Sequence, residues 1–228
     1  MTYDEFLSGV LKYWGLFDKG LKKQANKFLF EFSESFKETV SEENADAVLF
    51  RFCREYLDEK KFPVRRDLPF QLKGLIYDYI NRECEREKMP QMRWAFQLFG
   101  KYYNPHDPKN ENNPYIILEK AYNHPDCDQI TVDLYFNEQI EWLYWGAHHF
   151  PEGCIISKES YENTIKTAEK ILSEKTVDPA LVEDFEYYKK LYEIYYSWSE
   201  NGRNGDFYAL CESAGLQFTP VRAFYYTK

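Results

Sequence analysis

Apolar residues recur at helical intervals along almost the whole chain, and this spacing limits the fold more than any other feature of the sequence. Phe28, Phe32 and Phe36 stand four residues apart, and the segment 72–80 repeats apolar residues in an i, i+3, i+4 pattern. No stretch of four to eight residues alternates between apolar and polar in the way that a half-buried strand does. The sequence therefore predicts an all-α fold, an irregular multi-helix bundle of about ten helices.

Capping residues mark where several of these helices begin. Asn113 precedes Pro114 and Asp178 precedes Pro179, so each pair combines a capping side chain with a proline in the first turn. Ser157 is expected to cap the helix that follows it. Residues 128–148 are expected to form one helix, and a long tyrosine-rich helix is expected from Pro179 to residue 199.

A weak internal similarity allows a second arrangement of the same helices. Residues 115–122 (YIILEKAY) resemble residues 207–214 (FYALCESA) in size and pattern, and each segment follows a turn. Stacked helical hairpins of the solenoid type would produce such similarities. The alternative to an irregular bundle is therefore a set of stacked helical-hairpin pairs.

The charge is divided unequally along the chain. Residues 1–114 contain 19 basic and 19 acidic residues, whereas residues 115–228 contain 10 basic and 19 acidic residues. The balance changes near the segment 104–113, which is rich in Pro, Asn and Asp. We therefore expect a charge-balanced helical subdomain over 1–103, a polar connecting loop over 104–113 and an acidic, Tyr-rich helical subdomain over 114–228, together forming one compact unit.

These features exclude several classes of protein. Acidic surface repels phosphate backbones, which disfavours nucleic acid as a partner. No apolar run approaches the roughly 20 residues of a membrane span, so no membrane partner is expected. The five cysteines are widely spaced and form no CxxC pair, which is typical of reduced thiols and predicts a cytoplasmic protein.

Common catalytic and cofactor motifs do not occur in the chain. There is no GxSxG, no GxxxxGK[ST] and no GxGxxG, so neither a serine nucleophile nor a phosphate-binding loop is indicated. We therefore predict no catalytic residue, no cofactor and no metal, which favours a protein that is not an enzyme without deciding the point.

One helix nevertheless offers an alternative, enzymatic interpretation. At about 100° per residue, the face of 128–148 opposite the apolar stripe carries Glu138, Glu141, His148 and His149. Carboxylates and imidazoles on one face can bind a metal or transfer protons. This alternative is a metal-dependent or acid/base enzyme, and a zinc site formed with His124, Cys127 and Cys154 is a variant of it whose spacing matches no standard pattern.

The preferred interpretation places function on a surface. Aromatic residues make up 19% of the chain, and tyrosine suits surfaces that a partner covers because its ring is apolar and its hydroxyl is polar. Acidic surface attracts basic partners. We therefore expect a non-catalytic protein that binds a basic protein, for example an inhibitor or immunity-type protein that neutralises it. The predicted contact residues are Trp142, Trp145, Tyr188, Tyr192, Tyr195 and Trp198.

Overall fold

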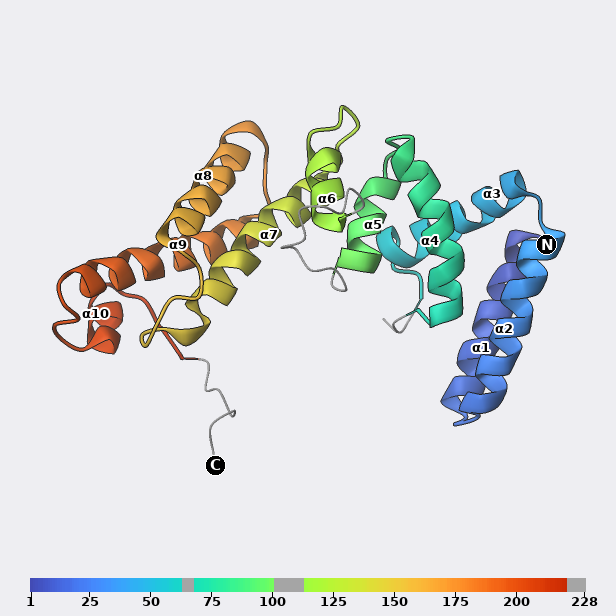
Figure 1. Cartoon of the computed structure of the whole chain (residues 1–228), viewed down its shortest axis with the longest axis horizontal. Helices are drawn as coiled ribbons and strands as arrows, with labels where there is room; N and C mark the ends of the chain where they lie inside the picture. The colour runs from blue at the N-terminus through green and yellow to red at the C-terminus, as the bar shows by residue number, and fades with distance from the viewer. Residues whose placement is uncertain (63–67, 101–112, 221–228) are drawn as a thin grey trace. The chain divides into compact units, whose positions relative to one another are not determined.

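The computed structural model describes residues 1–62, 68–100 and 113–220. Within these ranges the chain forms ten α-helices and no β-strand (Figure 1). The all-α prediction with about ten helices is therefore confirmed, whereas the stacked-hairpin arrangement stays a prediction. None of the helices in these ranges is both long and apolar enough to cross a membrane.

The helices divide into two compact units, Met1–Asn123 and His124–Lys228. The first unit contains α1 (Tyr3–Asp18), α2 (Lys22–Thr39), α3 (Glu42–Cys53), α4 (Phe70–Glu85), α5 (Gln91–Phe99) and α6 (Pro114–Tyr122). The second contains α7 (Gln129–Gly146), α8 (Lys158–Glu174), α9 (Pro179–Glu200) and α10 (Phe207–Ser213). The predicted connecting loop 104–113 lies outside the described residues except for Asn113.

Capping explains several of the observed helix starts. Asn113 and Asp178 accept hydrogen bonds from the backbone N–H groups of the first turns of α6 and α9, and a proline follows each of them. The Ser157 hydroxyl accepts from the backbone N–H of Ser160 at the start of α8. These three capping predictions are confirmed.

The first unit is built on a core of large apolar side chains. Helices α1 and α2 form a hairpin in which the ring of Phe32 lies so close to Gly9 that any Cβ at that position would collide with it. The ring of Phe6 packs against Phe36 at 5.2 Å and against Phe52 of α3 at 5.5 Å. Helix α4 packs on α2 and α5, and α5 packs on α6.

A π-helical turn over Arg54–Asp58 follows α3. Apolar spacing does not reveal one extra residue in a turn, so the sequence pattern gives no sign of this π-helical turn. Such insertions are often found at functional or specialised positions in a helix. This one contains two carboxylates, Glu55 and Asp58, and Glu55 is buried.

The second unit packs α7 against both α8 and α9, and α10 against α9. The apolar stripe predicted for residues 128–148 is confirmed, because all five of its members are buried: Val132, Phe136, Ile140 and Leu143 of α7, and Ala147 in the turn that follows it. Gly146 permits the close approach of α9, since a Cβ there would collide with the hydroxyl of Tyr192 and with Ile156.

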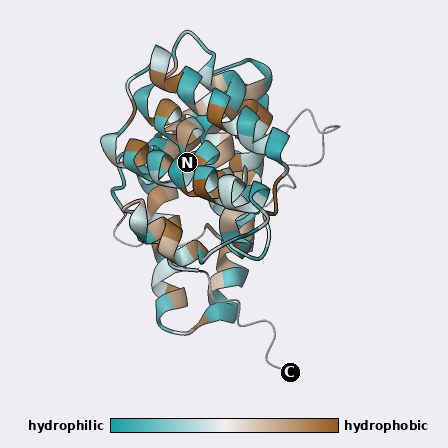
Figure 2. Ribbon diagram, turned by 90° about the vertical axis from the view of Figure 1, so that its left-hand side faces the viewer, coloured by the Kyte–Doolittle hydropathy of each residue, from teal (hydrophilic) through white to brown (hydrophobic). Residues whose placement is uncertain are grey.

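Hydropathy along individual helices agrees with these contacts. Figure 2 shows hydrophilic and hydrophobic residues mixed along single helices, as expected for amphipathic helices that bury one face.

All five cysteines are free thiols, and burial raises the pKa of Cys84 to about 12.

Candidate functional site

Five aromatic and imidazole side chains lie together on α7, the turn after it and α9, and we call them the aromatic patch: Tyr144, Trp145, His148, His149 and Tyr188. The ring of Tyr144 lies 5.7 Å from that of Trp145 and 6.3 Å from that of Tyr188. The His148 ring lies 5.6 Å from Trp145 and 5.4 Å from His149. Trp145 is 54% exposed and His149 is also exposed, so the patch is open to a partner.

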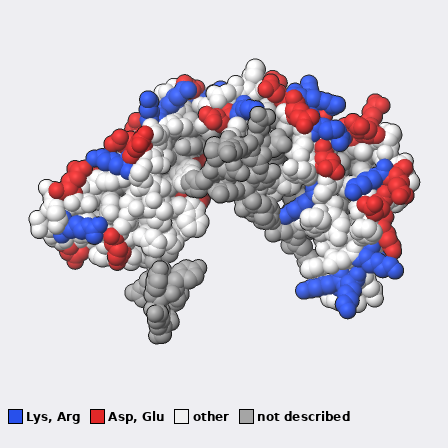
Figure 3. Space-filling model, in the orientation of Figure 1, with Lys and Arg blue, Asp and Glu red and all other residues white. Residues whose placement is uncertain are grey.

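Two carboxylates, Asp184 and Glu141, act on Tyr188 of this patch. Burial raises the pKa of the Tyr188 hydroxyl to about 12, and the neighbouring charges of Asp184 and Glu141 raise it further. The unit His124–Lys228 contains 18 acidic and 9 basic residues and so carries the whole net charge of −9. Figure 3 shows acidic and basic side chains intermingled over the visible face of α8 and α9, so this excess is spread over the surface rather than gathered in one block.

The structure places the six predicted partner-contacting residues in four different settings, the last of which is the buried one of Tyr192 and Tyr195. Trp145 and Tyr188 belong to the aromatic patch. Trp142 lines a groove between α7 and α8. Trp198 is half-buried against α10, where its indole N–H donates to the carbonyl of Gly205 at 3.0 Å.

Tyr192 and Tyr195 are buried, and a partner cannot contact them on the surface of this structure. The ring of Tyr192 stacks on Tyr161 at 4.6 Å, and its hydroxyl donates to the Leu143 carbonyl at 3.0 Å. Tyr195 stacks on Phe150 at 3.9 Å. The apolar face of α9 is wide enough to contact α7, α10 and the chain after α7, which is why aromatic spacing alone did not separate the covered rings from the exposed ones.

The alternative polar set is only partly brought together. Burial, assisted by the nearby charge of Glu141, raises the pKa of Glu138 to about 7. His148 and His149 lie in the short turn that follows α7, where His148 packs on Tyr144 and Trp145. The Nδ1 atom of His148 is shielded from solvent and has no hydrogen-bond partner among the described residues.

The variant zinc set is engaged in local contacts. His124 Nδ1 accepts from the backbone N–H of Asp126, the thiol of Cys127 lies 3.7 Å from the Asp128 carbonyl, and that of Cys154 lies 3.1 Å from the Ile156 carbonyl. Among the residues that the structure describes, no three His, Cys, Asp or Glu side chains gather closely enough to hold a metal ion.

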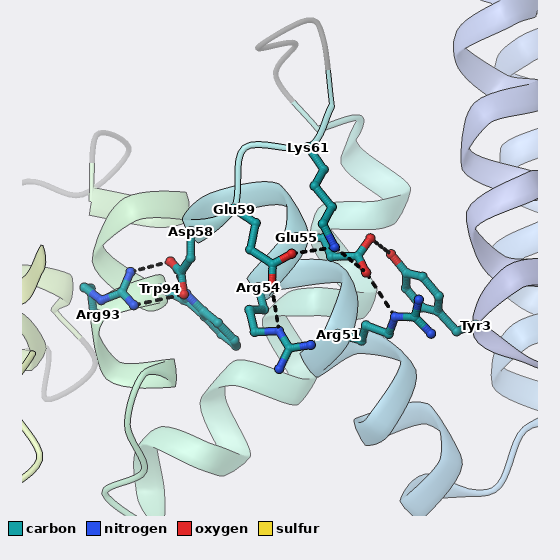
Figure 4. A network of polar contacts seen from close by, with 9 residues as sticks. All are labelled: Tyr3, Arg51, Arg54, Glu55, Asp58, Glu59, Lys61, Arg93 and Trp94. Atoms are coloured by element: carbon teal, nitrogen blue, oxygen red, sulfur yellow. Dashed lines mark hydrogen bonds and ion pairs between the residues drawn. The ribbon is translucent and has the colours of Figure 1, made fainter.

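The first unit contains a polar network that the sequence reasoning missed, and Figure 4 shows its nine residues. The buried Glu55 accepts from the Tyr3 hydroxyl at 2.6 Å and from Arg51 Nε at 3.0 Å, and it lies 3.4 Å from Lys61 Nζ. The Arg51 guanidinium also lies over the Tyr3 ring at 3.9 Å. Burial favours a raised pKa for Glu55, but the hydrogen bonds from these three donors outweigh it and lower that pKa.

The other end of the π-helical turn holds an ion pair between the buried Arg93 and the partly buried Asp58. Arg93 is 1% exposed, and its guanidinium donates to both oxygens of Asp58, at 2.6 and 3.0 Å. The indole N–H of Trp94 donates to the same carboxylate at 3.1 Å, and Gln97 accepts a further bond from Arg93. Bidentate pairs of this kind are geometrically specific.

This network joins elements that are distant in the sequence. Glu55 is 52 residues from Tyr3, and Asp58 is 35 residues from Arg93. Each carboxylate already has several donors, which suits holding the turn in place better than transferring protons. No local motif could have revealed these pairs, because their spacing is set only by how α1 and α5 pack against the π-helical turn.

Comparison with known proteins gives no family assignment. The chain matches no protein-family model, no curated protein and no solved structure.

Proposed function

We propose that this chain is a non-catalytic protein-binding protein whose second unit engages a basic protein through the aromatic patch. The observation that carries this proposal is the exposed Trp145, set among further rings on a unit with a net charge of −9. Tryptophan and tyrosine are enriched at the positions that dominate binding energy in protein interfaces.

Charge and aromatic contacts have separate roles in this proposal. The acidic surface speeds encounter with a positively charged partner and disfavours acidic ones. The rings of Trp145 and Tyr188 then supply apolar area that slows dissociation, since most affinity differences within one interface lie in the dissociation rate.

An inhibitor or immunity-type protein is the form of this function that the charge fits best. A nuclease-like toxin binds phosphate with a basic surface, and an acidic protein can occupy that surface in place of the nucleic acid. The five free thiols are compatible with a reducing compartment, and a cytoplasmic location is part of the proposal.

Affinity capture with matched baits tests the proposal. Wild-type chain, W145A and F30A are immobilised and exposed to extract of the source cell at low and moderate salt, and the retained proteins are identified by mass spectrometry. We expect a basic protein that wild type and F30A retain and that W145A loses. Phe30 is the control because it is also exposed, at 58%, but lies on α2 of the first unit.

Two outcomes would contradict the proposal. If all three baits retain the same proteins, Trp145 does not contribute to binding. If the proteins lost by W145A are acidic, the charge argument is wrong even though the patch binds.

The alternative function is an acid/base enzyme, and one observation favours it. A carboxylate with a pKa of about 7, as Glu138 has, is matched to proton transfer near neutral pH. Screening small-molecule classes with wild type and E138Q tests this alternative. Turnover that wild type shows and E138Q lacks would support it, and turnover that both show equally would remove Glu138 from it.

A further inference from the structure

A groove between α7 and α8 combines one indole with many uncharged polar side chains. Its volume is about 410 Å³, and it is lined by Gln139, Trp142, Ser157, Glu159, Ser160, Asn163, Thr164 and Thr167. It shares no residue with the aromatic patch. From this lining we infer that the groove is a binding site for a neutral saccharide.

Helical spacing explains how the groove acquires its lining. Gln139 and Trp142 are three residues apart, so they lie on one face of α7. Ser160, Asn163 and Thr167 recur at intervals of three and four along α8, which places them on one face of that helix. Since α7 and α8 pack against each other, the indole and the polar face border the same space.

Several groups in the groove are available for hydrogen bonds. Within the described part of the chain, the side-chain amide of Asn163, the hydroxyl of Ser160 and the carboxylate of Glu159 have no protein partner. An amide offers two donors and an acceptor, and a hydroxyl offers one donor and two acceptors. Adjacent hydroxyls of a sugar match such a mixture, because each of them both donates and accepts.

Trp142 supplies the apolar half of the recognition. One face of many sugar rings consists of C–H groups, and such a face can lie against the negative face of an aromatic ring. Trp142 is half-buried, which holds the indole in position while leaving part of it to line the groove.

The same lining disfavours charged ligands. Among the described residues that line the groove there is no Lys or Arg, so a phosphate or sulfate group would meet no cation from them. Glu159 is the one charged side chain among the eight lining residues, and six of the others are neutral amides or hydroxyls. A basic side chain would use the single carboxylate but would leave most of these groups unmatched.

A titration with simple sugars tests the inference. Glucose, galactose, mannose, N-acetylglucosamine and their β-linked disaccharides are added to the full chain and followed by calorimetry and by amide shifts in NMR spectra. We expect saturable binding of at least one sugar with a Kd of roughly 0.1–10 mM, as suits an open site that buries little ligand surface.

Three variants locate the binding. W142A and N163A should each weaken the sugar by about tenfold or more, whereas W145A should change the Kd by less than about twofold. Asn163 is exposed, so N163A is expected to retain the fold. If W142A fails to fold, N163A decides the result.

Absence of saturable binding for every sugar at roughly 100 mM would reject the inference, as would binding that neither W142A nor N163A weakens. Binding of an oligolysine peptide in this groove without any sugar binding would also reject it. W145A separates this test from the test of the proposed function, because that variant should lose the protein partner and keep the sugar.

Discussion

Removing the Asp58 carboxylate should strongly destabilise the first unit. In D58A the guanidinium of Arg93, 1% exposed, loses two hydrogen bonds of 2.6 and 3.0 Å, and the buried Trp94 indole loses its acceptor. Removing one partner of a buried ion pair lowers the stability by about 3–5 kcal/mol. Gln97 still accepts one bond from Arg93, so we expect a value within that range rather than above it.

Urea unfolding followed by circular dichroism measures this cost. The matched control is R86A, which removes an ion pair of 2.7 Å to Glu83 in the same unit. Arg86 is 57% exposed, and we therefore expect the control to cost less than about 1 kcal/mol. The double variant D58A/R93M should be more stable than D58A alone, because it removes the buried charge that has lost its Asp58 partner.

Two results would refute the reasoning about Asp58. A cost for D58A as small as that of R86A would mean that water reaches the Arg93 guanidinium. If adding R93M to D58A lowers the stability by as much as R93M alone does in the wild-type chain, the two side chains contribute independently rather than as a pair.

Three further predictions follow from other contacts. Y3F should cost about 1.5–3 kcal/mol in urea unfolding because Glu55 loses a charged hydrogen bond of 2.6 Å, and a cost near zero would show that water replaces the hydroxyl. G146A should lower the free energy of unfolding by about 1–3 kcal/mol, because the added Cβ collides with Tyr192. G74A should raise it by about 0.5–1 kcal/mol, because Gly74 lies in helix α4 with open space around it. Equal changes in the two variants would contradict this prediction. Because the pKa of Glu138 rises from an ordinary 4.5 to about 7, the folded state holds its proton longer than the unfolded state, and wild-type stability should fall as pH rises from about 4.5 to 7. E138Q should lack this fall in pH-dependent melting, and an identical profile would contradict the assignment.

Local signals in the sequence predicted much of the fold. Capping at Asn113, Ser157 and Asp178 depends on residues within one turn, and the inward stripe of α7 depends on spacing within one helix. Those predictions needed no knowledge of how the helices pack.

The candidate site was less predictable, because it depends on contacts between helices. Trp145 is exposed and Tyr192 is buried, although both are large rings on amphipathic helices. The difference arises because Gly146 lets α9 approach α7 closely, which buries Tyr192 of α9 against α7. The Asp58–Arg93 pair likewise depends on a π-helical turn that apolar periodicity does not register.

The most direct measurement for the central claim is the kinetics of the captured basic protein on immobilised wild type and on Y188A/W145A. Between low and moderate salt, we predict a large fall in the association rate for both chains, because ions screen the acidic unit. At fixed salt, we predict faster dissociation for the double variant and little change in its association rate. An association rate insensitive to salt, together with equal dissociation from both chains, would contradict the account.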